Sequence, residues 1–401
     1  MKGSSLVRFN IGDHVMMHNK PGDISKEVGV TIEETGRSIH GVEKKGHFYP
    51  EDSKSMPDEY GQRASDSTRR KTIVVTGGAG YVGSILTRKL LLADYRVVCI
   101  DNLRFGGSAL VSIWNHPHFV FKKADITDYP AVDRIVSENP DCYAIVHLAA
   151  IVGDPACRLE PELARRTNLD GSIHLLNMAA EANIERFVFA STCSNYGKMT
   201  DSCGYVDESS PLAPVSLYAE LKVAVEDFIL SRTNSTVGFC PTCLRFATAY
   251  GISPRMRFDL TVNEFTKELA LGRELVVFGE QFWRPYCYVG DFSRAILTVL
   301  NRPKPEVAYN VFNVGDTDEN YTKKMIVDEL LRLVPDGNVK YVKKEEDPRD
   351  YRVKFDKIRH ELGFRISRTV PEEIDGILRT IRLGIIDDPD NRRYYNTPIE
   401  K

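Results

Sequence analysis

The sequence predicts an α/β fold, a doubly wound parallel sheet followed by a smaller C-terminal lobe. From residue 71 onward, short apolar runs alternate with stretches of helical apolar spacing, which is typical of a parallel sheet with helices on both faces. The first run, Ile73 to Val75, leads into a glycine-rich turn and then a helix. This strand–turn–helix order is that of the Rossmann nucleotide-binding fold.

The expected elements follow in chain order. Strands are predicted near 72–76, 96–101, 119–124, 144–148, 186–191 and 238–246, and the longest helices over 160–182 and 216–231. The alternation ends at Gly251, so we assign 71–250 to a nucleotide-binding domain and 251–401 to a substrate-binding lobe. Residues 285–316, with a helix over 291–300 and a strand over 309–314, are expected to return to the first domain.

Residues 1–70 form a separate N-terminal extension. They are polar and carry linker-like stretches, which favours a partly disordered segment. The alternative is an arm that covers a neighbouring subunit or the mouth of the active site, and a short strand or hairpin is conceivable over 12–20.

Composition excludes several classes of function. A net charge of −3 over 401 residues argues against binding to nucleic acid or to an anionic membrane surface. No apolar stretch is long enough for a membrane span, and no secretion signal pattern is present. The eight scattered cysteines are then expected to be reduced thiols of a cytoplasmic protein. Cys240-x-x-Cys243 is better explained by packing in a strand than by metal or redox chemistry, so no metal site is expected.

The glycine-rich turn is the first candidate binding site. Gly78-x-Gly80-x-x-Gly83 lies where a dinucleotide diphosphate would meet the N-terminus of a helix, although a plain tight turn would also need glycine. Asp101, after the next strand, could accept both ribose hydroxyls, which favours NAD over NADP despite the neighbouring Arg104. Asp125 could meet the adenine edge, or could cap either the helix over 129–137 or the nearby Thr127.

The candidate catalytic residues come later. Tyr218 and Lys222 are four residues apart on a predicted helix, so they share one face, and an ammonium beside a phenol would favour the phenolate form of a general base. Thr192 ends a strand rich in hydroxyl residues and could bridge substrate and phenol, although such hydroxyls also bond their own turn. Tyr-x-x-x-Lys pairs are common on helices, so the preceding dinucleotide pattern gives this one its weight.

Together these motifs resemble the extended short-chain dehydrogenases/reductases, and within them the NAD-dependent nucleotide-sugar epimerase/dehydratase family. The resemblance covers about 71–385 and rests on Thr76-Gly77-x-x-Gly80-x-x-Gly83, Asp101, Asp125, His147-Leu148-Ala149-Ala150, Asn168, Ser191-Thr192 and Tyr218-x-x-x-Lys222. It implies bound NAD, a nucleoside diphosphate sugar as substrate, and a homodimer formed through the helices over 160–182 and 216–231.

The resemblance also implies a role for each matching residue. Thr192, Tyr218 and Lys222 would be catalytic. Cofactor contacts are implied at Gly77, Gly80, Tyr81, Val82, Asp101, Asn102, Asp125, Ile126, Leu148, Ala149, Ala150, Asn168, Tyr218 and Lys222. Substrate contacts are implied at Val152, Thr192, Thr248, Arg255, Arg257, Arg284 and Arg349. The alternative for Arg284 and Arg349 is a surface ion pair, and for Arg255 and Arg257 a pair with Asp259 or Glu264.

Departures from the family pattern bear on the reaction. The 4,6-dehydratases carry Asp-Glu directly after the catalytic threonine, where this chain has Cys193-Ser194. The reactive cysteine of the 3,5-epimerases would stand at Ser194, so packing is the better explanation of Cys193. The family's usual asparagine is Thr248 here. The segments 250–266, 284–286 and 347–351 resemble a subgroup that includes bacterial oxidoreductases acting at C4 of GDP-heptose.

The sequence therefore predicts an NAD-dependent oxidoreductase or epimerase that acts at C4 of a nucleoside diphosphate sugar through a 4-keto intermediate. A 4,6-dehydratase or decarboxylase is the enzymatic alternative. A non-catalytic NAD-binding sensor or scaffold is the alternative from another class, and the joint presence of Thr192, Tyr218 and Lys222 argues against it.

Overall fold

The computed structural model describes residues 29–34, 37–44, 47–50, 70–199, 204–232, 238–345, 347 and 349–397. The chain divides into two compact units, 1–69 and 70–401. In the first unit, β1 (Gly29–Glu34), β2 (Arg37–Lys44) and β3 (His47–Pro50) form an antiparallel sheet. The strand or hairpin considered over 12–20 lies outside the described residues, and the role of the extension stays a prediction.

The second unit is built on a seven-stranded parallel sheet in the order β13-β9-β8-β7-β4-β5-β6. Its strands are β4 (Thr72–Thr76), β5 (Arg96–Asp101), β6 (Phe119–Lys123), β7 (Cys142–His147), β8 (Arg186–Thr192), β9 (Cys240–Phe246) and β13 (Asn310–Val314). The strand order reverses between β4 and β7, and such a reversal opens a crevice at the carboxyl ends of the strands. The predicted fold class is confirmed.

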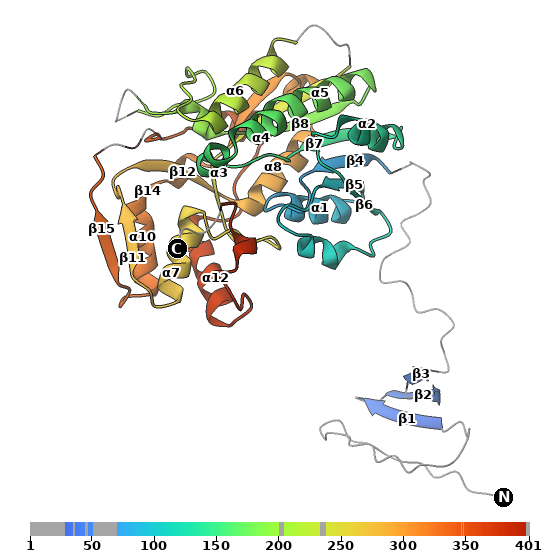
Figure 1. Ribbon diagram of the computed structural model, residues 1–401. Coiled ribbons are helices and arrows are strands. Elements are labelled where there is room, and N and C mark those ends of the chain that lie inside the picture. The colour runs from blue at the N-terminus through green and yellow to red at the C-terminus, as the bar shows by residue number, and fades with distance from the viewer. Residues whose placement is uncertain are drawn as a thin grey trace, which may run out of the picture. The chain divides into compact units, whose positions relative to one another are not determined.

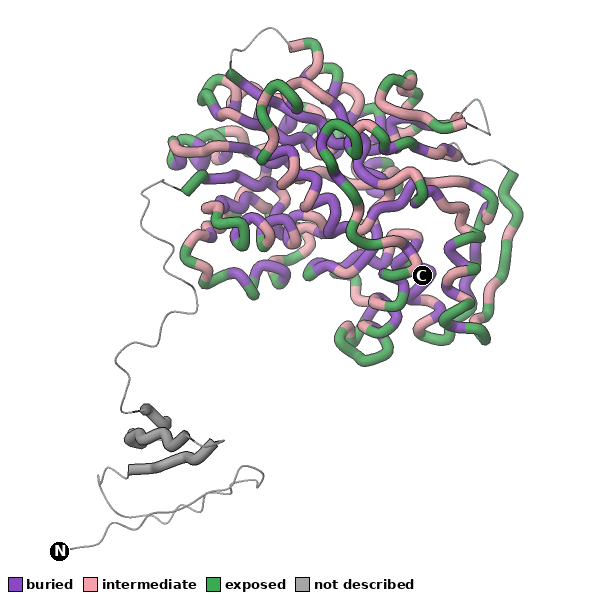
Figure 2. Tube along the Cα trace, turned by 180° about the vertical axis from the view of Figure 1, so that it is seen from behind, coloured by how far each residue is buried: buried purple, intermediate pink, exposed green. Residues whose placement is uncertain are grey.

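Helices cover both faces of this sheet (Figure 1). One face packs on α1 (Gly83–Leu92), α8 (Val289–Asn301) and α11 (Asp356–Leu362), the other on α2 (Tyr129–Ser137), α5 (Gly171–Glu181) and α6 (Leu217–Leu230). The apolar residues of the central strands are buried between these layers (Figure 2). The sheet residues therefore read as continuous apolar runs because both faces are covered.

The helix predicted over 160–182 is interrupted. The chain forms α3 (Asp154–Leu159), α4 (Pro161–Arg165), a π-helical turn (Arg166–Asp170) and then α5. Proline at the first position of α4 is compatible with a new helix start, because that position needs no N–H donor. By contrast, α6 agrees with its prediction, and Ser216 caps it by accepting a hydrogen bond from the N–H of Ala219.

The remaining elements form a second lobe with its own core. It contains α7 (Thr261–Ala270), α10 (Lys323–Leu333) and α12 (Val370–Arg382), with the strand pair β11 (Leu275–Phe278) and β15 (Val339–Val342). A three-stranded sheet, β10 (Thr248–Tyr250), β12 (Trp283–Tyr288) and β14 (Asn320–Thr322), lies beside them. Thr369 and Glu372 form a capping box at α12, which fixes where this helix begins.

The chain returns to the large sheet after β12. α8 packs into the core of the sheet, the short α9 (Lys304–Val307) follows, and β13 pairs with β9 from Asn310↔Thr242 to Val314↔Phe246. These contacts agree with the expected return of 285–316, and the exact division into two domains remains a proposal.

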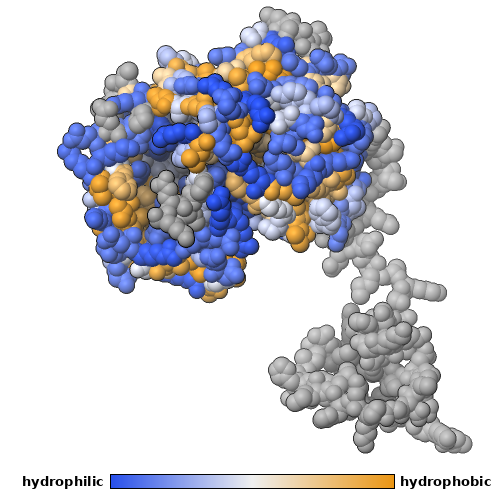
Figure 3. All heavy atoms as spheres, in the orientation of Figure 1, coloured by the Kyte–Doolittle hydropathy of each residue, from blue (hydrophilic) through white to orange (hydrophobic). Residues whose placement is uncertain are grey.

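The surface mixes hydrophilic and hydrophobic residues on the face shown in Figure 3. Within the described ranges, no helix has the length and apolar character needed to cross a membrane. The seven cysteines in those ranges are free thiols, and Cys240 and Cys243 are buried in β9, so this pair packs in a strand as expected. The described residues include no group of His, Cys, Asp and Glu that could hold a metal ion.

Candidate functional site

A cavity of about 730 Å³ lies at the carboxyl ends of the central strands, lined by both the sheet and the second lobe. It brings together nearly all residues that the sequence singled out. Its lining includes Gly77, Gly80, Tyr81, Val82, Asp101, Asn102, Asp125, Ile126, Leu148, Ala149, Ala150, Val152, Thr192, Tyr218, Lys222, Thr248, Arg255, Arg257, Arg284 and Arg349. Asn168 is the one expected contact residue outside the lining, and Gly78 of the glycine pattern and His147 also do not line the cavity.

The glycine-rich turn forms one end of this cavity and leaves no room for side chains. A Cβ on Gly83 would lie 2.1 Å from the carbonyl oxygen of Gly77, and one on Gly77 would lie 2.7 Å from the backbone nitrogen of Ala149. Gly77 also has φ +74°, a conformation that glycine adopts without strain. No side chain caps the N-terminus of α1. A bare backbone at an uncapped helix start fits the diphosphate of a dinucleotide.

Asp101 connects this turn to the end of β5. Its two carboxylate oxygens accept hydrogen bonds from the N–H groups of Ala79, at 3.0 Å, and Leu103, at 2.8 Å. Burial raises the pKa of this carboxyl, while the two N–H donors and the charge of Arg255 lower it. Asp101 is thus held where a ribose would pass the glycine-rich turn.

Asp125 lies next to Asn102 in the lining of the cavity. Asn102 donates to it at 2.7 Å, and Asp125 accepts two further hydrogen bonds from Thr127. The helix cap considered for Asp125 is instead provided by Asp128, which accepts from Ala131 at the start of α2. Asp125 therefore does not cap α2, because its carboxylate lies three residues too early, whereas the alternative of a cap at Thr127 is observed.

Asn168 lies behind the cavity wall. Its carboxamide accepts a hydrogen bond from the N–H of Ile151 and donates one to the carbonyl of Ile151, both at 2.8 Å. The side chain is fully buried. Asn168 therefore holds the loop after β7 in place, and in this structure it does not line the cavity.

His147 plays a similar internal role. Its ring nitrogens lie 2.7 Å from the hydroxyl of Thr76 and 2.9 Å from that of Ser172. Burial lowers the pKa of His147 to about 3, so the ring is neutral at physiological pH. It joins β4, β7 and α5 below the glycine-rich turn.

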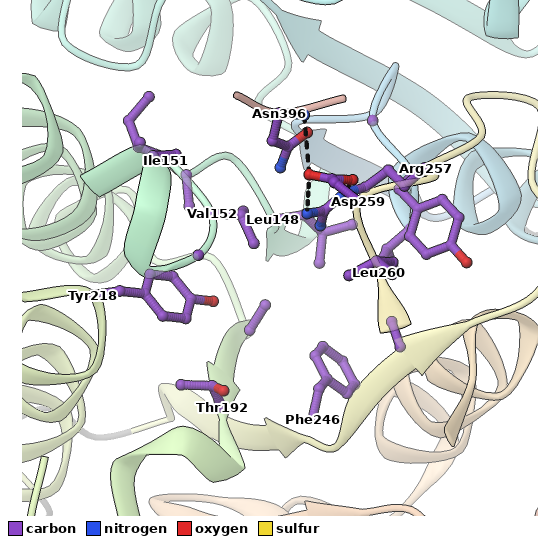
Figure 4. A pocket seen from close by; sticks show the side chains of 18 of the residues that line it. Leu148, Ile151, Val152, Thr192, Tyr218, Phe246, Arg257, Asp259, Leu260 and Asn396 are labelled. Carbon is purple, nitrogen blue, oxygen red and sulfur yellow. Dashed lines mark hydrogen bonds and ion pairs between the residues drawn. The ribbon is translucent and has the colours of Figure 1, made fainter. Parts of the chain in front are cut away.

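The Tyr218 hydroxyl and the Thr192 side chain face the same cavity (Figure 4). Thr192 also accepts a hydrogen bond from the N–H of Ser194 at 3.1 Å, so the bonding within its own turn exists alongside its place in the cavity. Two hydroxyls that face one cavity can hold and deprotonate a substrate alcohol.

Lys222 is anchored to the end of β8, and its predicted effect on Tyr218 stays a prediction. Its ammonium donates to the carbonyl oxygen of Ala190 at 2.6 Å and lies 4.5 Å from the ring centre of Phe189. Burial lowers the pKa of Lys222 to about 8. Burial raises the pKa of the Tyr218 phenol, and the cation that acts against this rise is Arg257.

A buried charged network supports the catalytic strand and helix. Arg245 of β9 and Glu226 of α6 are 2.7 Å apart and almost fully buried. Asn195 donates to Glu226, and Arg245 donates to the Tyr196 hydroxyl. This network fixes the turn after Thr192 against α6, and reasoning from sequence missed it. A glutamate on the apolar face of a helix and an arginine inside an apolar strand were the available signals.

A second group of charges lies at another part of the wall. Arg284 pairs with Asp347 at 2.9 Å, and Arg349 pairs with Asp154 at 2.9 Å and approaches Asp347 at 3.6 Å. The ion-pair alternative is thus observed, but inside the cavity rather than on the outer surface. Lys323 also lines this wall, so three cations gather here.

Arg257 and Arg255 differ in their partners. Arg257 makes two 2.9 Å hydrogen bonds to the carboxylate of Asp259, and the N–H of Asn396 donates to the same carboxylate at 3.0 Å (Figure 4). Arg255 donates to the side-chain oxygen of Asn396 at 2.8 Å. The pairing alternative is observed for Arg257, whereas Arg255 is bound by a neutral residue near the C-terminus that the sequence did not single out.

Comparisons with known proteins agree with this geometry. Residues 73–315 match the model of the NAD dependent epimerase/dehydratase family. The chain is 31% identical over 330 residues to a dTDP-glucose 4,6-dehydratase of Streptomyces niveus, covering 77% of this chain and 91% of that protein.

Solved structures give the same picture. The UDP-glucose 4-epimerase of Thermotoga maritima, determined with UDP-glucose, is 26% identical with a TM-score of 0.69 over 78% of this chain and 99% of its own. The dTDP-glucose 4,6-dehydratase of Streptomyces venezuelae, determined with NAD, is 27% identical with a TM-score of 0.68 over 81% of this chain and 98% of its own. The similar proteins thus include both an epimerase and dehydratases.

Proposed function

The chain belongs to the NAD-dependent epimerase/dehydratase family, and on that premise we propose that it oxidises a nucleoside diphosphate sugar at C4. The 4-keto sugar is then reduced on its other face, which gives an epimer, or is released. The observation that carries the proposal is the meeting of Thr192 and Tyr218 in the cavity that the glycine-rich turn closes.

The chain's own groups divide the work of the first step. Thr192 holds the C4 hydroxyl, and Tyr218 takes its proton. Lys222 is proposed to favour the phenolate. The charge of Arg257 also lowers the phenol pKa, although burial raises that pKa more. Lys222 fixes α6 to β8 through Ala190 and presents a donor to the nicotinamide ribose. The glycine-rich turn and Asp101 would hold NAD, which would supply the hydride acceptor for C4.

The diphosphate of the sugar nucleotide is proposed to bind at the wall formed by Arg284, Arg349 and Lys323. Arginine forks bind phosphate oxygens in pairs. Before binding, the ion pairs with Asp154 and Asp347 hold Arg284 and Arg349 in place. On binding, the diphosphate would replace these carboxylates as the partner of both arginines. The three cations gathered at this wall support an anionic ligand.

Elimination of water is the less favoured outcome. The residues after Thr192 are Cys193 and Ser194, and neither is a carboxylic acid. Burial raises the pKa of Cys193 well above its usual range, and its thiol donates to the carbonyl of Arg245 at 3.3 Å. This thiol is occupied in packing and is not poised to protonate a leaving hydroxyl.

The finer assignments remain predictions. They are the GDP-heptose-like subgroup, the identity of base and sugar, a cytoplasmic location, and a homodimer formed through α4, α5 and α6. The named roles of individual site residues belong to the same proposal.

The test is an absorbance measurement of cofactor reduction. Wild-type protein loaded with NAD is mixed with UDP-, GDP-, CDP- and dTDP-sugars, and one of these should produce bound NADH. Tyr218→Phe should keep its NAD and lose the reaction, because the ring still fills its site. Full activity in this variant would overturn the assignment, and binding of NAD without any nucleotide sugar would favour a sensor or scaffold.

A further inference from the structure

Arg255 is a buried cation that lines the cavity and has an unused donor. The residue is only 6% exposed. One terminal nitrogen donates to Asn396, and the guanidinium carbon lies 4.2 Å from the ring centre of Phe105. Among the described residues and their contacts, its Nε has no hydrogen-bond partner. A buried donor of this kind is costly unless a ligand completes it.

Unlike Arg257, Arg255 has no carboxylate of the described residues hydrogen-bonded to its guanidinium. Both carboxylate oxygens of Asp259 already bind Arg257. The other nearby carboxylate, Asp101, uses its oxygens on two backbone N–H groups. Burial and the charge of Arg257 lower the pKa of Arg255 to about 10, so the group is still charged at neutral pH. A buried cation without its own carboxylate is a candidate for binding an anion.

The position of Arg255 in the cavity indicates which anion it binds. The segment that carries it is tied to the glycine-rich turn, because the Tyr81 hydroxyl donates to the Gly251 carbonyl at 2.6 Å and Ser253 donates to the Tyr81 carbonyl at 2.7 Å. The guanidinium itself lies against Phe105, on the loop that follows Asp101. Arg255 thus reaches from the second lobe to the cofactor end of the cavity.

The cavity therefore holds two separate sets of free or exchangeable cations. Arg284 and Arg349 share Asp347 at one wall. Arg255 lies against Phe105, on the segment that Ser253 ties to Tyr81 of the glycine-rich turn. Two ligands with a diphosphate each, the cofactor and the substrate, would occupy this cavity under the proposed function. The simplest arrangement is that each set of cations binds one of the two diphosphates.

We propose that Arg255 binds the diphosphate of the cofactor rather than that of the sugar, as a ligand that the second lobe contributes to the first. This inference rests on the proposed function, and it reassigns a residue that the family resemblance placed at the substrate. Glycine-rich turns bind a diphosphate through backbone N–H groups, and Arg255 adds a full charge to them.

The last part of the chain positions this cation. We name residues 387–397 the C-terminal strap. Lys267 of α7 donates to Asp390 at 2.9 Å and to the Tyr395 hydroxyl at 2.8 Å, and the N–H of Phe258 donates to the Tyr394 carbonyl at 2.9 Å. These contacts place Asn396 between Arg255 and Asp259. Asn396 is then a positioning residue, and the strap becomes a determinant of cofactor retention.

The experiment compares NAD binding by wild-type protein, Arg255→Gln and the control Arg379→Gln. Arg379 is 72% exposed on α12, so its variant carries the same loss of charge outside the cavity. Each protein is stripped of cofactor and titrated with NAD by calorimetry. NAD affinity of Arg255→Gln should fall about 10- to 100-fold, since a charged hydrogen-bond donor is lost, and that of Arg379→Gln should match the wild type.

Two further variants keep the test decisive. Arg255→Lys retains the positive charge but lacks the paired donors of the guanidinium. Its NAD affinity should therefore lie between those of the wild type and Arg255→Gln, and it provides a test even if the glutamine variant folds poorly. Asn396→Ala should weaken NAD binding less than Arg255→Gln does, and nucleotide-sugar KM at saturating NAD should change little in either. Unchanged NAD affinity of Arg255→Gln would overturn the inference. If the same variant also had a raised KM for the sugar nucleotide, Arg255 would be assigned to the substrate site instead. Wild-type protein that binds no NAD would overturn the proposed function as well, whereas NAD binding without nucleotide-sugar turnover would overturn the function alone.

Discussion

The ammonium nitrogen of Lys222 lies 2.6 Å from the carbonyl oxygen of Ala190. This contact joins one turn of α6 to the last part of β8, two residues before Thr192. Lys222 is 2% exposed, so the contact is shielded from water. The lysine therefore acts first as a tie between the helix that carries Tyr218 and the strand that carries Thr192.

Replacing this tie should affect the reaction far more than the fold. Lys222→Met should lower kcat by about 100-fold or more, because the two hydroxyls lose their relative position and the ribose donor is gone. The free energy of unfolding should change by less than about 2 kcal/mol, since the lost hydrogen bond is offset by the burial cost of the ammonium. Steady-state kinetics and urea unfolding measure the two effects. A variant with normal kcat would show that Lys222 has no role in the site.

The glycine-rich turn offers a steric test. Gly83→Ala would place a Cβ 2.1 Å from the Gly77 carbonyl oxygen, and the backbone there cannot move aside. We expect loss of NAD binding together with a lowered melting temperature. Gly376→Ala on α12 is the matched control, because its Cβ would meet nothing closer than 3.7 Å. That variant should gain about 0.5–1 kcal/mol in helix stability. Calorimetric NAD titration and thermal unfolding distinguish the two glycines, and a Gly83→Ala protein that binds NAD normally would contradict the fit of this turn.

Removing Arg349, one of the two arginines that share Asp347, should weaken binding of the substrate only. Arg349→Gln should raise the KM for the nucleotide sugar about 10- to 100-fold, since a charge-assisted contact to the diphosphate is lost. Its NAD affinity should stay unchanged, which separates it from Arg255→Gln. Arg332→Gln on α10, 72% exposed, is the control for loss of charge. If Arg349→Gln lost NAD affinity instead, the allocation of the two cation sets would be wrong.

Stability should depend on pH through Glu319. Burial raises the pKa of Glu319 to about 7, against hydrogen bonds from Val370, Tyr321 and Tyr250. Between about pH 4.5 and 7 the folded protein then keeps a proton that the unfolded chain has lost, so its stability falls as pH rises through that window and levels off above it.

The comparison that isolates this group uses Glu319→Gln. The difference in melting temperature between wild type and variant should shift in favour of the variant from pH 5 to pH 7.5, because glutamine cannot ionise. Glu361→Gln, at an exposed position on α11, should show no such trend. Parallel curves for wild type and Glu319→Gln would show that the buried carboxyl does not titrate in this range.

The sheet and the cavity residues were largely accessible from sequence because their signals are local. The apolar strand 73–75 precedes a turn where Gly77 and Gly83 tolerate no Cβ, and Tyr218 and Lys222 are one helical turn apart. Local spacing of this kind survives in the folded structure. The break of the helix at Pro161 was also a local signal, and it was overlooked.

The partners of the charges were not accessible, since they depend on contacts far apart in the chain. Arg349 meets Asp154 across 195 residues, and Arg255 meets Asn396 across 141. Only the completed fold decides that Lys222 contacts a carbonyl, or that Asn168 holds a loop from behind. The partners of these charged and polar side chains therefore depend on burial and electrostatics in the folded chain, which residue spacing does not reveal.

The hydrogen bond from Tyr81 to Gly251 has a mechanical consequence. Asn263 donates to the same hydroxyl, and Ser84 and Ser253 contact each other beside it. The two lobes are thus pinned at the corner where the glycine-rich turn lies, and any widening of the cleft pivots about that corner. Sugar nucleotides would enter and leave at the free edge while the dinucleotide stays at the hinge, which is how one tightly held cofactor could serve many turnovers.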